Sequence, residues 1–112
     1  MKNIPTKMRM SHILLSWSDA VGSTHTRDLV FALKEADMLL AELKKGTMTW
    51  KQCVTGHSAC LATPFGTGDM GWREQHEITP ELWRVCSILE VGELCPTPIQ
   101  SPYGIHIIMR TG

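Results

Sequence analysis

Two histidines lie in the middle of strongly apolar runs near opposite ends of the sequence. His12 is at the centre of "MRMSHILLSW", and His106 lies within "YGIHIIMRTG". A buried imidazole needs a hydrogen-bond partner, and two neighbouring buried histidines can supply each other with one. The residues alone therefore favour a satisfied structural pair over a reactive one, because a histidine on an apolar strand face is usually part of a core.

Each histidine belongs to a segment that has the pattern of a half-buried strand. In residues 7–17, alternating positions share a face, which places His12 beside Met8, Met10 and Leu14. Residues 104–111 form a similar strand around His106. For the histidines to meet, these two strands must be neighbours in a sheet.

Three helices are predicted between the two strands. Apolar residues spaced by four and three indicate a first helix, with Thr26 as its N-cap and an end at residue 46. Thr49 opens a short second helix. Thr79 as N-cap and Pro80 at the first helical position begin the third, which Gly92 ends.

The remaining segments predict little regular structure. Residues 58–71 are rich in glycine and small side chains, so we expect a loop with at most a short strand at 70–72. Pro96 and Pro98 restrict residues 94–100 to an edge or irregular strand. The order strand, helices, strand, helix, strand, strand indicates an α+β domain whose first and last strands could be neighbours.

Length and charge narrow the possible partners. The chain of 112 residues suits a single domain, with about residues 1–6 as a short N-terminal extension. Eleven basic residues balance eleven acidic ones, so the net charge argues for neither nucleic acid nor a membrane surface. No stretch has the pattern of a signal peptide or a membrane span, and we expect a cytoplasmic monomer. The four cysteines form no C-x-x-C pair and are expected to be reduced.

Five motifs give the sequence a family resemblance. They are "SHILLS", "HSAC", "GTGDMGW", "EVGEL" and "SPYGIHIIMRT". In order and spacing they resemble the parvulin-type peptidyl-prolyl cis-trans isomerases, over nearly the whole chain. The resemblance implies a four-stranded antiparallel sheet surrounded by three to four helices, with the histidine pair beneath a shallow proline-binding cleft. It also implies an isomerase that assists protein folding by acting on proline-containing polypeptide segments, without a cofactor.

The resemblance also implies two sets of site residues. The catalytic set is His12, Cys60, Ser101 and His106, and the substrate-binding set is Ile78, Leu82, Met70 and Trp72. No metal is expected among them.

The chemistry of the reaction is compatible with such a site. Rotation about an X-Pro bond meets a barrier of about 18–20 kcal/mol but makes no covalent change, so the enzyme needs to bind a twisted amide. An apolar pocket can hold the proline ring, while Cys60 supplies a polar group near the carbonyl. A nucleophilic Cys60 is the alternative, although the sequence offers no separate acid for a triad.

Other functions compete with this interpretation. Ile78 and Leu82 are aliphatic where the family commonly has methionine and phenylalanine, which favours as an alternative a weakly catalytic module that binds proline-containing segments. A metal site from His57, Cys60 and His76 is a further alternative, but its spacing matches no zinc pattern.

The loop after the first strand predicts the substrate's charge. Residues 16–26 contain no arginine or lysine, whereas a phosphate before proline needs charge-assisted partners. We therefore expect activity that does not depend on phosphate. A preference for phosphorylated substrates would instead require Arg9, Arg27 or Lys34 to supply positive charge from outside this loop.

Overall fold

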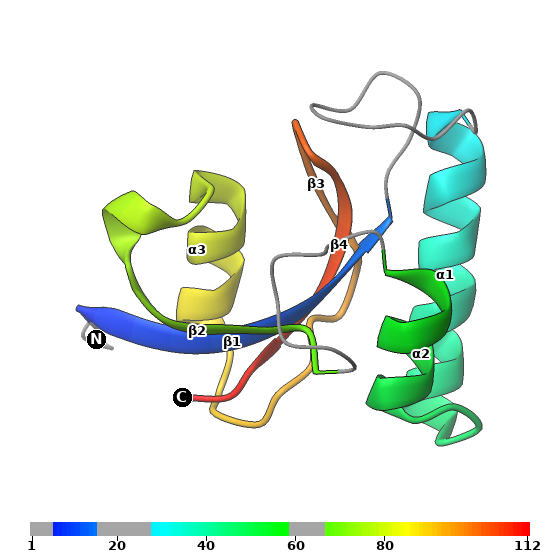
Figure 1. Ribbon diagram of the computed structural model, residues 1–112, viewed down its shortest axis with the longest axis horizontal. Coiled ribbons are helices and arrows are strands. Elements are labelled where there is room, and N and C mark those ends of the chain that lie inside the picture. The colour runs from blue at the N-terminus through cyan, green and yellow to red at the C-terminus, as the bar shows by residue number, and fades with distance from the viewer. Residues whose placement is uncertain (1–5, 16–27, 59–66) are drawn as a thin grey trace.

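A computed structural model describes residues 6–15, 28–58 and 67–112, which form a four-stranded antiparallel sheet with helices around it (Figure 1). The strand order is β2-β1-β4-β3, so the first and last strands are neighbours at the centre, as the two histidine runs predicted. The strands are β1 (Lys7–Leu15), β2 (Asp69–Glu74), β3 (Ile99–Ser101) and β4 (Gly104–Arg110). The predicted α+β class and sheet are confirmed.

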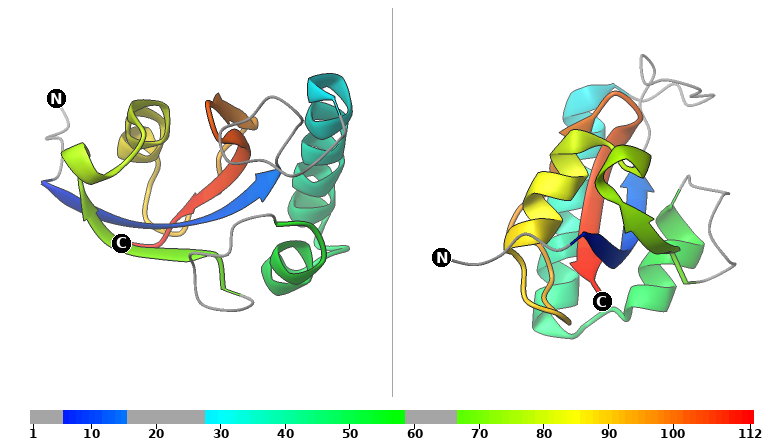
Figure 2. Two further views of the ribbon diagram at one scale, coloured as in Figure 1. Left: turned by 45° about the horizontal axis from the view of Figure 1, so that its top comes forward. Right: turned by 90° about the vertical axis from the view of Figure 1, so that its left-hand side faces the viewer.

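Within the described residues, three α-helices and one 3₁₀ turn accompany the sheet. They are α1 (Leu29–Lys45), α2 (Trp50–His57), η1 (Gln75–Glu77) and α3 (Pro80–Ile88). The right-hand view of Figure 2 shows α3 in front of the sheet and α1 behind it. No helix in the described segments is long and apolar enough to cross a membrane.

The helix starts follow from local capping, with one correction. The N-cap of α1 is Asp28, whose Oδ1 accepts a hydrogen bond from the Phe31 N–H at 2.8 Å, and not the predicted Thr26. Thr49 caps α2 as predicted, and Gln52 completes a capping box with it. The N-cap Thr79 and the first-turn Pro80 of α3 are also as predicted.

Two ends differ from the expected ones. Helix α3 ends at Ile88 with Leu89 as its C-cap, so it stops before Gly92, the residue that was predicted to end it. In residues 94–100, only Ile99 and Gln100 join the strand β3, because the prolines interrupt pairing, while Leu94 forms an isolated bridge to Met109.

Strand β2 is longer than expected and contains an irregularity. Arg9 pairs with Trp72 and Ser11 with Asp69, so β2 has one more residue than β1 between these pairs. Gly71 takes a φ of 74° there, and its N–H donates to Asp69 Oδ1 at 2.9 Å. Such a bulge bends the strand, and a glycine accommodates the left-handed conformation.

Candidate functional site

The histidines lie side by side at the centre of the sheet. Leu14 pairs with His106 and His12 with Ile108, and directly opposed residues share a face, so His12 and His106 point to the same side. Their Nδ1 atoms are 3.1 Å apart, with ring centroids separated by 5.3 Å. Both residues are buried. The predicted pairing of the two histidines is therefore confirmed.

Ser101 extends the pair into a chain of three side chains. Its Oγ lies 2.6 Å from His106 Nε2 and accepts the Tyr103 N–H at 3.2 Å. Donation of the Ser101 hydroxyl proton to His106 Nε2 leaves the proton of His106 on Nδ1, which then donates to His12 Nδ1. The proton of His12 is thereby placed on Nε2.

His12 Nε2 ends this chain without a partner in the part of the protein that the structure describes. An unpartnered polar atom on a buried ring is costly, so it marks a position where another polar group would be stabilising. With the proton assignment above, Nε2 is a hydrogen-bond donor.

Burial keeps both imidazoles neutral. Desolvation lowers the pKa of His12 to about 4. Desolvation and then the neighbouring His12 lower the pKa of His106 to about 3. Near neutral pH the pair is uncharged, as the chain of one-way hydrogen bonds requires.

Cys60 lies outside the described residues, but the residues that flank its segment are placed. The Leu14 N–H donates to Ser58 Oγ at 3.1 Å, and the His12 N–H donates to the Gly68 carbonyl at 2.9 Å. A Cβ on Gly68 would lie 2.4 Å from the His12 carbonyl oxygen, so a glycine permits this approach. Both ends of the segment are thus bonded to the backbone of the histidine strand.

The structure separates one member of the substrate-binding set, Trp72, from the face of the sheet that carries His12. Ile78 and Leu82 are buried in the hydrophobic core, and α3, which carries Leu82, packs on β1, β3 and β4. Met70 is half-buried. Trp72 pairs with Arg9, which alternates with His12 along β1, so the structure places Trp72 on the opposite face from His12.

Sequence reasoning did not identify Ser58 and Gly68 as site residues. Both contact the backbone of a strand that is distant in the sequence, Ser58 through its Oγ and Gly68 through its carbonyl, and such contacts leave no periodic pattern. Their positions inside the motifs "HSAC" and "GTGDMGW" were the available signal.

Arg9 is already committed to a carboxylate. Its guanidinium bonds to both oxygens of Asp69, at 3.2 and 2.5 Å. The side-chain bond from Arg9 holds the pKa of Asp69 below its usual value. This pairing opposes recruitment of Arg9 by a phosphate group.

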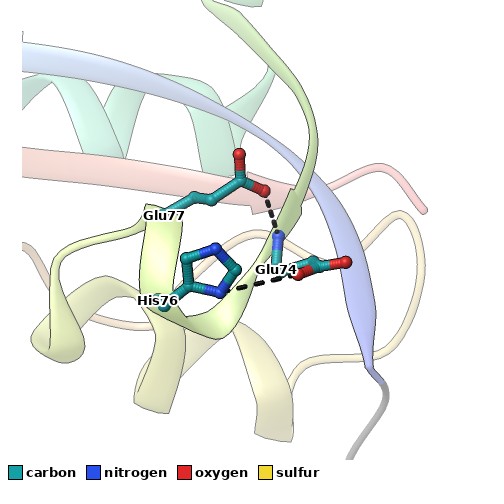
Figure 3. Close-up of side chains that lie close together, drawn as sticks. All are labelled: Glu74, His76 and Glu77. Atoms are coloured by element: carbon teal, nitrogen blue, oxygen red, sulfur yellow. Dashed lines mark hydrogen bonds and ion pairs between the residues drawn. The ribbon is translucent and has the colours of Figure 1, made fainter.

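Glu74, His76 and Glu77 form a group of potential metal ligands at the exposed turn η1 (Figure 3). Glu77 Oε1 accepts the Glu74 N–H at 2.9 Å, and His76 Nδ1 lies 3.5 Å from Glu74 Oε2. These are the contacts of a capped turn. The alternative metal site predicted from His57, Cys60 and His76 is not formed by the described residues. His57 belongs to no group of potential ligands among them, and its Nδ1 bonds to Glu35. Cys60 lies outside the described residues.

Comparisons with known proteins agree with the fold and with the family resemblance. The family model "PPIC-type PPIASE domain" (rotamase) matches residues 12–112. Chaperone SurA of Nitrosospira multiformis is 32% identical over 97 residues, which are 87% of this chain and 20% of SurA. The chain spans about a fifth of the length of the curated relatives that it matches.

Solved structures share the fold. Peptidyl-prolyl isomerase ESS1 from Candida albicans superposes with a TM-score of 0.88 at 22% identity, over 100% of this chain and 66% of ESS1. Peptidylprolyl isomerase PrsA from Bacillus anthracis gives a TM-score of 0.73 at 28% identity, over 95% of this chain and 41% of PrsA.

Proposed function

Because the chain belongs to the PPIC-type PPIase domain family, a family of isomerases, we propose that it catalyses cis-trans isomerisation of X-Pro bonds in polypeptides without a covalent intermediate. The observation that carries the proposal is the chain Ser101–His106–His12, which ends in a donor with no partner among the described residues. Neutral, mutually bonded histidines are suited to orienting polar groups rather than to attacking a carbonyl.

Catalysis requires stabilisation of an amide that loses its resonance as it twists. In our proposal Cys60 provides the polar group near the substrate carbonyl, and His12 Nε2 orients it by a hydrogen bond. This arrangement would add an electrostatic contribution to that of an apolar proline site. Ile78 and Leu82 are proposed as the aliphatic wall of that site.

A proline-binding module with little turnover is the second candidate. Leu82 is 1% exposed and Ile78 8% exposed, so both contribute more to the core than to an open pocket for proline. The match to a chaperone, SurA, is consistent with binding of unfolded chains. A role in protein folding is common to both candidates.

Exchange NMR on an X-Pro peptide, with and without the protein, separates the two candidates. We expect catalysed exchange in the wild type, a substantial share of it in Cys60→Asp, and a larger loss in Cys60→Ala, because the position needs a polar or anionic group. Exchange at the uncatalysed rate with folded protein would leave the binding module. A trapped thiol adduct, or Asp as damaging as Ala, would contradict the non-covalent assignment.

We further propose that a phosphate before the proline is not required. Arg9 is paired with Asp69, and Lys34 is an exposed residue of α1. Arg27 and the loop of residues 16–26 lie outside the described residues. In a matched pair of peptides, Ser-Pro should be isomerised with a kcat/KM at least as high as that of phosphoSer-Pro. A preference of tenfold or more for the phosphorylated peptide, about 1.4 kcal/mol, would refute this proposal.

A further inference from the structure

The end of α2 is joined to α1 by a polar contact. His57, the last residue of α2, places its Nδ1 2.8 Å from Glu35 Oε2 on α1. The Glu35 side chain is 14% exposed and that of His57 30%. Partial shielding from water strengthens such a contact, and a carboxylate on one ring nitrogen fixes the orientation of the imidazole.

The next residue continues this connection to the sheet. Ser58 is the C-cap of α2, and its N–H donates to the Val54 carbonyl at 3.1 Å. Its Oγ accepts the Leu14 N–H from β1. Helix α1, helix α2 and the histidine strand are therefore connected through two consecutive residues, His57 and Ser58.

This junction lies close to the proposed site. On β1, Leu14 is two residues from His12, and in the sequence Cys60 is two residues after Ser58. The opposite anchor, from the His12 N–H to the Gly68 carbonyl, uses backbone atoms alone. The Ser58 anchor instead uses the Oγ of its side chain. Its position therefore depends on how the contact between His57 and Glu35 holds the end of α2.

We infer that Glu35 is a positioning residue for isomerisation, an inference that rests on the proposed function. By holding His57, it fixes Ser58 against Leu14 and sets the distance between His12 and the start of the segment that contains Cys60. Without the carboxylate, His57 loses its partner on α1 and the end of α2 can shift relative to β1. A misplacement of about 1 Å is enough to cost a large factor in rate.

The test compares Glu35→Ala, Glu35→Gln and Asp37→Ala, the last being an exposed carboxylate on the same helix. We expect Glu35→Ala to lower kcat for X-Pro exchange roughly tenfold with little change in KM. It should also lower the hydrogen-exchange protection of the Leu14 amide. Glu35→Gln, which keeps the shape and a hydrogen-bonding oxygen, should recover most of the rate, and Asp37→Ala should match the wild type.

The outcomes distinguish the two proposals. A wild-type protein without catalysis refutes the proposed function and this inference with it. An active wild type with an equally active Glu35→Ala refutes the inference alone, as does a loss of rate with unchanged protection of Leu14. If Glu35→Ala does not fold, His57→Ala, which removes the other side of the same contact, decides: a lowered kcat together with lowered Leu14 protection supports the inference, and wild-type values for both overturn it.

Discussion

Replacing His106 with alanine is expected to lower the free energy of unfolding by about 2–5 kcal/mol. The substitution leaves a cavity in the sheet and removes the partner of both Ser101 Oγ and His12 Nδ1. Both partners are buried, so water cannot replace the lost bonds without rearrangement. Urea unfolding at pH 7.5 measures the change.

Ser101→Ala is the matched control, because it removes only the first member of the hydrogen-bonded series Ser101–His106–His12. The two histidines stay bonded to each other. We expect it to cost about 1–2 kcal/mol. Equal losses in the two variants would contradict the chain of hydrogen bonds. Unchanged stability of His106→Ala with abolished exchange would instead assign His106 a direct catalytic role.

Acidification is expected to destabilise the fold by a few kcal/mol between about pH 6.5 and pH 4. The pKa values of His12 and His106 are about 4 and about 3 in the folded protein, against an ordinary value of 6.5. Between these values the unfolded chain binds more protons than the folded one, so each lowering of pH favours unfolding. The histidine contribution to stability is complete above about pH 6.5 and is lost as pH falls toward the folded pKa values.

Chemical unfolding at a series of pH values measures this effect. Asp69 and Glu77 have lowered pKa values and contribute at more acidic pH, so the interval from pH 6.5 to 4.5 isolates the histidines. His76→Ala, a change at a 76% exposed side chain, should leave the curve unaltered. A free energy of unfolding that stays constant from pH 7 to pH 5 would show that the buried pair does not control acid stability.

Much of the fold could be predicted because its central elements carry strong local patterns. Alternating apolar residues identified β1 and β4, and capping residues identified α2 and α3. The start of α1 was misplaced because Thr26 and Asp28 are both suitable caps, and only the bond from Phe31 N–H selects Asp28. The length of β2 could not be predicted, because its second half is exposed and shows no alternation of buried and exposed residues.

The site was predictable to the extent that it lies in regular strands. His12, His106 and Ser101 were identified by alternation and by the family motifs, and the structure brings them together. The anchors at Ser58 and Gly68 were not predicted, because they depend on which backbone amide of β1 lies opposite them. The face on which Trp72 lies could not be read from the sequence either, since it depends on the strand register around the bulge at Gly71.

The central pairing of β1 with β4 has a consequence for how the protein folds. The two strands bring together His12 and His106, which are 94 residues apart, so a loop of that length must close before the middle of the sheet exists. Helices α1, α2 and α3 lie between the strands and can form local structure earlier. Folding of the sheet should therefore be slow for a domain of this size, and during synthesis it must wait until β4 has left the ribosome.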